Sequence, residues 1–159
     1  MRGKSPQKRL LLPDSLYGNR LITKLINRVM RDGKKAMAQK QVYQAFDLLK
    51  EKAKNEEVAE VFRQALENIK PNMEVRSRRV GGAAYQVPTP VKGERRETLA
   101  IRWLINSARA RANSQYHSFA EKLAAELWDA FHNEGEAIRK KETIHKMADA
   151  NKAFAHFRW

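Results

Sequence analysis

Cysteine is absent from this chain of 159 residues. A chain without thiols forms no disulfide bond, offers no thiolate to a metal ion and has no cysteine nucleophile, which excludes cysteine-based zinc fingers and suits a reducing compartment. The four histidines show neither the helical spacing of metal ligands nor an adjacent acid arranged for catalysis. They are His117, His132, His145 and His156. We therefore expect no metal site and no catalytic residue.

Long hydrophobic runs are also missing. The run Leu10-Leu11-Leu12 ends at Pro13, and it is too short for the apolar region of a signal peptide. No apolar run reaches the length of about 20 residues that a membrane-spanning helix needs. We expect a soluble protein that stays in the cytoplasm and has no membrane partner.

Motifs for nucleotide chemistry are not found either. The segment Asp32-Gly33-Lys34-Lys35 lacks the upstream glycine of a phosphate-binding loop. Acidic residues cluster only weakly, as at Glu56-Glu57, so a metal-dependent nuclease would have to assemble its carboxylates from distant elements. A nuclease or an RNA-modifying enzyme is one alternative function, but the sequence shows no set of catalytic residues for it. We therefore expect neither enzymatic activity nor a cofactor.

Acid is scarce relative to base. The chain has 32 lysines and arginines against 18 aspartates and glutamates, a formal net charge of +14, while 42% of its residues are hydrophobic. This length and composition suit one domain with an ordinary core. The surface of that domain must attract a polyanion, and nucleic acid is the first candidate.

Apolar residues recur with helical spacing in six segments. In the first, residues 20–31, the apolar stripe faces away from Arg20, Lys24, Arg28 and Arg31. One interpretation of this row is a solvated face; because almost no acid interrupts it, contact with an anion is an interpretation at least as good. The second and third helices, near residues 35–54 and 56–70, carry charges of both signs and are interpreted as scaffold. The last two start at the capping box Ser118/Glu121 and after Gly135.

After Pro71, and up to the turn at Gly81-Gly82, apolar and polar residues alternate, so that the spacing of apolar residues changes from helical to every second residue. This pattern predicts a two-stranded hairpin, with Arg76 and Arg78 on the face of Glu74 and Arg79 on the other. A lone two-stranded ribbon is marginal in water, and three arginines in four residues add repulsion that a polyanion relieves. We expect the ribbon to bind nucleic acid and to be mobile until it does.

A fourth helix is predicted over residues 97–111. Arg95, Arg102 and Arg109 recur every seven residues and so lie on one face, and Arg111 is expected to extend it. The tail, residues 150–159, interleaves aromatic residues with cations. Two interpretations fit it equally: stacking on bases, or packing of Phe154, Phe157 and Trp159 on the core.

The charge and the predicted β-ribbon also fit a second class of nucleic-acid-binding protein, the architectural proteins that bend DNA. Such proteins carry basic β-arms with a proline that wedges into a base step, a role open to Pro88 here. They are, however, much shorter chains that dimerise, whereas this chain has six helices with which to build its own core.

Residues 68–88 read NIKPNMEVRSRRVGGAAYQVP. This segment resembles the signature of protein seven of the small ribosomal subunit. The residues match the bacterial type of that family, and the organellar members are similar to that type. Four further matches follow the same order, at residues 12–14, 32–35, 100–103 and 147–159, so the resemblance spans nearly the whole chain. Residues 112–119 depart from the family pattern, in which a shorter turn contains glycine and lysine.

The resemblance implies a mainly α fold: a single domain over residues 1–159, with six helices and a projecting two-stranded β-ribbon between helices three and four. A basic arm (1–13), the ribbon (72–90) and a basic, aromatic tail (150–159) are its expected parts. It also implies a structural role in translation. The protein would bind the 3′ major domain of 16S rRNA, nucleate assembly of the subunit head, adjoin other proteins of the head and platform, and lie near mRNA and exit-site tRNA.

Two sets of site residues follow from the resemblance. The implied rRNA-binding residues are Lys8, Arg9, Arg20, Lys24, Arg28, Arg31, Lys34, Lys35, Arg76, Arg78, Arg79, Arg95, Arg102 and Arg109. The implied tRNA-proximal residues are Arg78, Arg79, Gly81, Gly82 and Tyr85.

Overall fold

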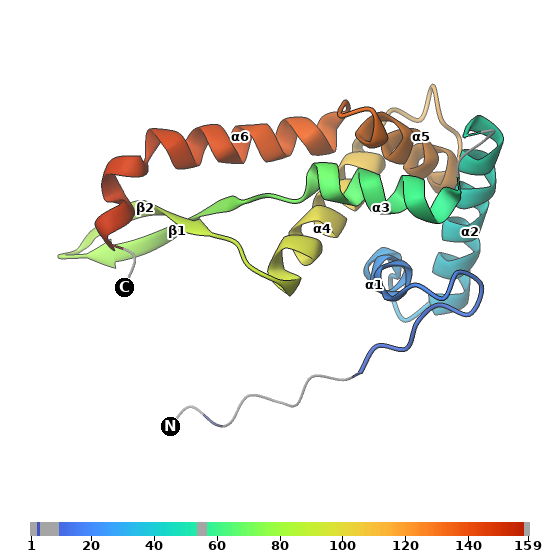
Figure 1. Ribbon diagram of the computed structural model, residues 1–159, viewed down its shortest axis with the longest axis horizontal. Coiled ribbons are helices and arrows are strands. Elements are labelled where there is room, and N and C mark those ends of the chain that lie inside the picture. The colour runs from blue at the N-terminus through green and yellow to red at the C-terminus, as the bar shows by residue number, and fades with distance from the viewer. Residues whose placement is uncertain (1–2, 4–9, 54–56, 158–159) are drawn as a thin grey trace.

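A computed structural model describes residues 3, 10–53 and 57–157 of the chain. Within these residues there are six α-helices, two strands and a short 3₁₀ helix (Figure 1). Their bounds are α1 Arg20–Val29, α2 Lys35–Lys52, α3 Val58–Ile69, β1 Met73–Val80, β2 Ala83–Pro90, α4 Glu94–Ala110, α5 Phe119–Phe131, α6 Glu136–Ala150 and η1 Lys152–Phe157. The prediction of a mainly helical chain with a β-ribbon between α3 and α4 is confirmed.

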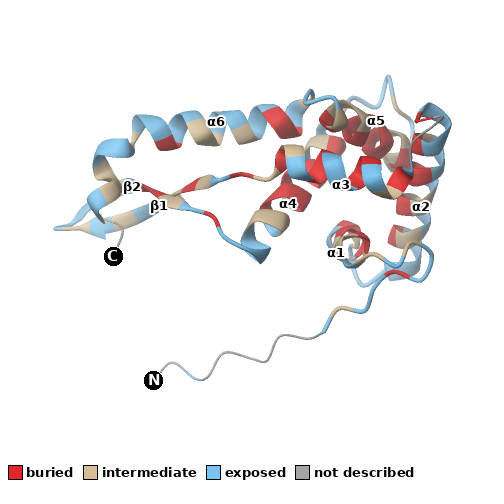
Figure 2. Ribbon diagram, in the orientation of Figure 1, coloured by how far each residue is buried: buried red, intermediate tan, exposed pale blue. Residues whose placement is uncertain are grey.

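The hydrophobic core lies among α1 to α5, where the buried residues gather in Figure 2. Helix α5 packs against α2, α3 and α4, and its residues from Leu123 to Leu127 are buried on every side. Phe46 of α2 and Phe62 of α3 are fully buried, with their ring centroids 5.5 Å apart. The apolar stripes of helical period thus become the core, as expected for amphipathic helices.

Local signals place the helix ends. The Oδ1 atom of Asn19 accepts a hydrogen bond from the backbone N–H of Leu21 at 2.8 Å, which caps α1. The predicted cap of α5 forms, with the backbone N–H of Glu121 donating to Ser118 Oγ at 3.2 Å. Helix α4 begins at Glu94, three residues before its predicted start, because Gly93 with φ of 53° turns the chain there.

Strands β1 and β2 pair antiparallel, from Met73 opposite Pro90 to Val80 opposite Ala83. Gly81 (φ 56°) and Gly82 (φ 87°) form the two-residue turn, which requires positive φ at both positions.

The ribbon also bears on the DNA-bending alternative. Pro88 lies opposite Val75 in the inner half of the ribbon and is buried. A wedging proline must stand exposed at the tip of its arm. The role considered for Pro88 is therefore wrong.

Helix α6 runs along the ribbon, and η1 then turns back onto β2 (Figure 1). Phe154 and Phe157 each place their ring centroid 5.2 Å from that of Tyr85. The aromatic tail therefore packs on the ribbon rather than on the core, where one interpretation had placed it; Trp159 lies outside the described residues. Met147 of α6 is 50% exposed because α6 covers the ribbon with one narrow face. Mobility of the free ribbon stays a prediction.

His145 of α6 joins the root of the ribbon. Its Nε2 atom accepts a hydrogen bond from the backbone N–H of Asn72 at 3.1 Å. Burial first, and then the charge of Lys141, lower the pKa of His145 from its ordinary value, against the opposing effect of Asp149. The neutral ring is therefore the form that the fold stabilises.

We expect the free energy of unfolding to decrease as the pH falls below about 6.5, because the unfolded chain then binds a proton at His145 that the folded chain, with its lowered pKa, resists. The variant His145→Gln keeps an acceptor but cannot titrate. Its stability, measured by urea unfolding from about pH 7.5 to pH 5.5, should depend less on pH than that of the wild type. Parallel profiles for the two proteins would contradict this linkage.

Candidate nucleic-acid interface

Helices α1 and α4 bring cations together at one end of their contact. Arg109 of α4 donates from Nη2 to the backbone carbonyl of Val29 at 3.0 Å, and its guanidinium carbon lies 6.0 Å from the ring centroid of Phe119. Burial, followed by the charges of Arg31 and Arg28, lowers the pKa of Arg109. Three guanidinium groups that repel one another form a site that an anion would stabilise.

A depression of about 320 Å³ lies beside this cluster. Arg31, Lys34 and Arg109 line it together with the ring of Phe119. Cations and an aromatic ring around one hollow suit a phosphate with its attached base. The two basic faces predicted from separate helices are thus one surface, and Lys34 belongs to it.

The other candidates of α1 differ in their surroundings. Arg20 is exposed at the first position of the helix, where the helix dipole disfavours a cation and no acid of the first turn offsets it. Lys24, by contrast, forms an ion pair with Glu97 of α4, with Nζ 2.6 Å from Oε2. The charge of Lys24 is therefore partly neutralised within the protein, whereas that of Arg20 faces solvent.

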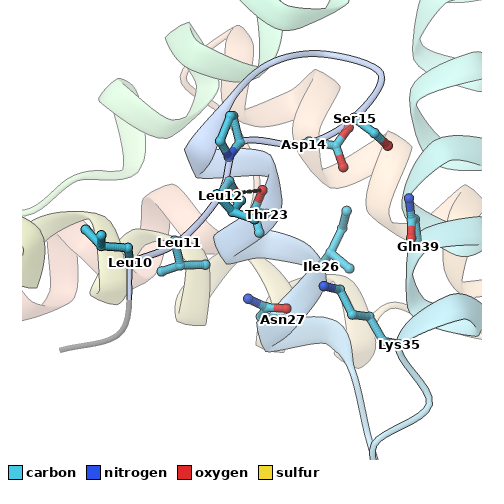
Figure 3. Close-up of a pocket in the computed structure, with 11 residues that line it drawn as sticks. Leu10, Leu11, Leu12, Asp14, Ser15, Thr23, Ile26, Asn27, Lys35 and Gln39 are labelled. Atoms are coloured by element: carbon cyan, nitrogen blue, oxygen red, sulfur yellow. Dashed lines mark hydrogen bonds between the residues drawn. The ribbon is translucent and has the colours of Figure 1, made fainter. Parts of the chain in front are cut away.

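Hydrogen bonds fix the N-terminal arm onto α1 and α2 from residue 12 onward. Thr23 Oγ1 donates to the carbonyl of Leu12 at 2.9 Å, and the buried carboxylate of Asp14 accepts a hydrogen bond from Tyr43 Oη at 2.9 Å. Figure 3 shows the pocket of about 500 Å³ that this segment forms with α1 and with the exposed Lys35. Lys8 and Arg9 lie outside the described residues.

Glu74 organises the base of the ribbon. The residue is 7% exposed, and its carboxylate forms ion pairs with Arg76 on its own strand and with Arg95 of α4, whose Nη2 atom lies 3.1 Å from Oε2. Two candidate arginines therefore share one buried carboxylate. Next to them, Arg96 donates from Nε to the carbonyl of Pro71 at 3.1 Å, which ties α4 to the ribbon root. Sequence reasoning did not assign this role to Arg96, although it adjoins Arg95.

The outer half of the ribbon carries two candidate arginines and the exposed turn. Arg79 is exposed, and so are Gly81 and Gly82 at the turn. Arg78 is half-buried and lies opposite Tyr85 in the register. Tyr85 is half-buried as well, because Phe154 and Phe157 contact its ring.

Arg102 of α4 and Arg111, the residue that caps the C-terminus of α4, depart from a simple basic face. Arg102 is half-buried, and its Nε atom is buried without a hydrogen-bond partner within the described part of the chain. Arg111 was expected to extend the basic face, and this is wrong. It is only 17% exposed and forms ion pairs with Glu126 and Asp129 of α5, while its guanidinium carbon lies 5.5 Å from the ring centroid of Tyr116.

Among residues 3, 10–53 and 57–157, no group of three histidine or acidic side chains is arranged to hold a metal ion. In the same residues, no helix combines the length and the apolar character needed to cross a membrane.

A family model and individual relatives of the chain all point to the same protein family. The family model for ribosomal protein S7p/S5e matches residues 1–152. The chain is 58% identical over 158 residues to the small ribosomal subunit protein uS7 of Moorella thermoacetica, covering 99% of this chain and 98% of that protein. It is 55% identical over 159 residues to the uS7 protein of Thermotoga neapolitana, covering all of both chains.

Proposed function

Because the chain belongs to the ribosomal protein S7p/S5e family, we propose that it binds 16S rRNA directly and nucleates folding of the 3′ major domain, the head of the small subunit. It is a structural protein of the small ribosomal subunit that acts in translation, and it is not an enzyme. For a chain so similar to bacterial relatives, that ribosome is the cytoplasmic one.

The convergence of Arg31, Lys34 and Arg109 on one depression, with Arg28 close enough to act on the charge of Arg109, is the observation that carries the proposal. Arg109 lies on α4, and Arg31 and Lys34 lie in the short connection between α1 and α2; burial first, and then the charges of Arg31 and Arg28, lower the pKa of Arg109. The net charge of +14 adds long-range attraction for RNA. The rRNA surface in this proposal comprises Lys8, Arg9, Arg20, Lys24, Arg28, Arg31, Lys34, Lys35, Arg76, Arg78, Arg79, Arg95, Arg102 and Arg109.

The outer half of the ribbon has a second role in the proposal. Its turn is exposed and glycine-rich, so that a nucleic-acid backbone can approach it closely. Arg78, Arg79, Gly81, Gly82 and Tyr85 then lie near exit-site tRNA and mRNA. Neighbouring proteins of the head and platform complete the set of partners.

Affinity for a 16S rRNA head-domain fragment should fall steeply with salt, by roughly 0.7 to 0.9 logarithmic units per phosphate contact and per tenfold change in salt. The double variant Arg28→Gln/Arg31→Gln should bind more weakly and with a shallower slope, because two contacts are lost. Filter binding or fluorescence anisotropy at several salt concentrations measures both quantities.

The matched control is Arg63→Gln/Arg139→Gln, which removes the same formal charge. Both of these arginines are exposed on helices and pair with a glutamate three residues earlier, Glu60 and Glu136. Equal losses in the two double variants would mean that net charge alone drives binding, and would contradict the α1/α4 site. Duplex DNA of equal length should compete poorly, and effective competition by DNA would contradict recognition of RNA shape.

A further inference from the structure

The two halves of the ribbon are held in different ways. In the inner half, Glu74, Val87 and Pro88 are buried against the rest of the protein. In the outer half, residues 81–84 are exposed, and small side chains leave little apolar area to bury. Two strands alone are marginal in water. The direction of the outer half, which carries Arg78 and Arg79, therefore needs support from outside the ribbon.

The C-terminal segment supplies such support. The chain leaves α6 at Asn151, whose Nδ2 atom donates to the carbonyl of Met147 at 2.8 Å, and η1 then crosses to β2. Phe154 and Phe157 contact the ring of Tyr85, with interplanar angles of 51° and 36°. Figure 1 shows η1 descending from the end of α6 beside the outer part of the ribbon.

We propose that residues 152–157 clamp the ribbon through Tyr85 and so hold Arg78 and Arg79 in the orientation in which they meet RNA. Tyr85 is then a positioning residue, and its ring packs on protein rather than on a base. This inference rests on the proposed rRNA binding. It also implies that the free ribbon is less mobile than the sequence alone predicts.

The physical basis is preorganisation. Tyr85 faces Arg78 across the register, so holding its ring holds the strand pair next to the exposed Arg79. Tilted aromatic pairs are favourable arrangements, and their rings have few rotatable bonds to order. A ribbon held in place before RNA arrives avoids the loss of conformational freedom that binding would otherwise impose on it.

The double variant Phe154→Ala/Phe157→Ala tests the clamp. Backbone amide exchange in the outer half of the ribbon, residues 78–86, should become faster in the free protein, while exchange in α3 and α5 stays unchanged. Affinity for the head-domain RNA should fall about three- to tenfold. The salt slope should stay the same, because every cation is retained.

Three further variants distinguish positioning of the ribbon by Tyr85 from a general loss of stability of the protein. Tyr85→Ala should also give faster amide exchange in the ribbon and weaker RNA binding. Tyr85→Phe keeps the ring and should show the exchange and the affinity of the wild type. Tyr116→Ala removes a half-buried ring from the 112–118 loop, far from the ribbon in the chain, and should leave ribbon exchange unchanged.

The outcomes separate the clamp from the proposed function. Unchanged ribbon exchange in the double variant overturns the clamp, and so does faster exchange throughout α3 and α5. Faster ribbon exchange with unchanged affinity overturns the positioning role. If the wild-type protein itself does not bind the RNA, the proposed function fails, while the exchange measurement on the free protein still decides whether the clamp exists.

Discussion

Replacement of Trp103 by alanine is expected to lower the free energy of unfolding by about 3 to 5 kcal/mol. Trp103 lies on α4, is 7% exposed and belongs to the hydrophobic core. It also lines a groove with Glu74 of the ribbon and Ile144 of α6, so its indole joins three elements. Loss of the ring leaves a cavity that the surrounding helices can fill only in part. Urea unfolding monitored by far-ultraviolet circular dichroism measures the change.

The variant Trp103→Phe is the control, because it keeps an aromatic ring in the same place and should destabilise less. RNA affinity of Trp103→Ala should fall together with the folded fraction. A loss of stability below about 1 kcal/mol for Trp103→Ala, the range of an ordinary surface change, would contradict its place in the core.

The helices follow from local sequence because each carries its own pattern. Val58, Val61, Phe62 and Leu66 recur at helical spacing, and all four are buried in α3. The ribbon is equally local, since the change to a period of two and the pair Gly81-Gly82 lie within one short segment. Patterns of this kind depend on neighbours in the chain, and so the sequence alone was sufficient to predict them.

The charges of the candidate interface depend on partners that are distant in the chain. Arg111 occupies the predicted helix, but Glu126, on another helix, accepts its hydrogen bond and takes it out of the basic surface. Arg95 is paired with Glu74 across 21 residues in the same way. Residue spacing places a cation on a face, but only the packing of elements decides whether an acid neutralises it.

The tail shows the same limit. Its alternation of aromatic residues and cations suits either bases or protein, and the choice depends on Tyr85, about seventy residues earlier in the chain. The convergence of Arg28 and Arg31 with Arg109 was also beyond prediction from spacing, because it results from the contact of α1 with α4.

Replacement of Glu126 by alanine should destabilise the protein by about 3 to 5 kcal/mol. Glu126 is 0% exposed; its Oε2 atom accepts a hydrogen bond from Arg111 Nε at 2.7 Å, and Oε1 accepts one from the backbone N–H of Ala137 at 2.9 Å. One carboxylate thus neutralises a largely buried guanidinium and satisfies the first turn of α6. Its removal leaves both donors with one acceptor fewer at a fully buried position.

Two comparisons make this prediction specific. Glu126→Gln keeps an acceptor for Ala137 but removes the charge, so it should destabilise less than Glu126→Ala. Glu136→Ala breaks the exposed pair with Arg139 and should change the free energy of unfolding by less than about 1 kcal/mol. In Glu126→Ala, amide exchange should be fastest in the first turn of α6 and, because α6 covers the ribbon, should also increase in β1. Similar small losses for Glu126→Ala and Glu136→Ala would mean that Arg111 is held by Asp129 alone, and that the start of α6 does not depend on this carboxylate.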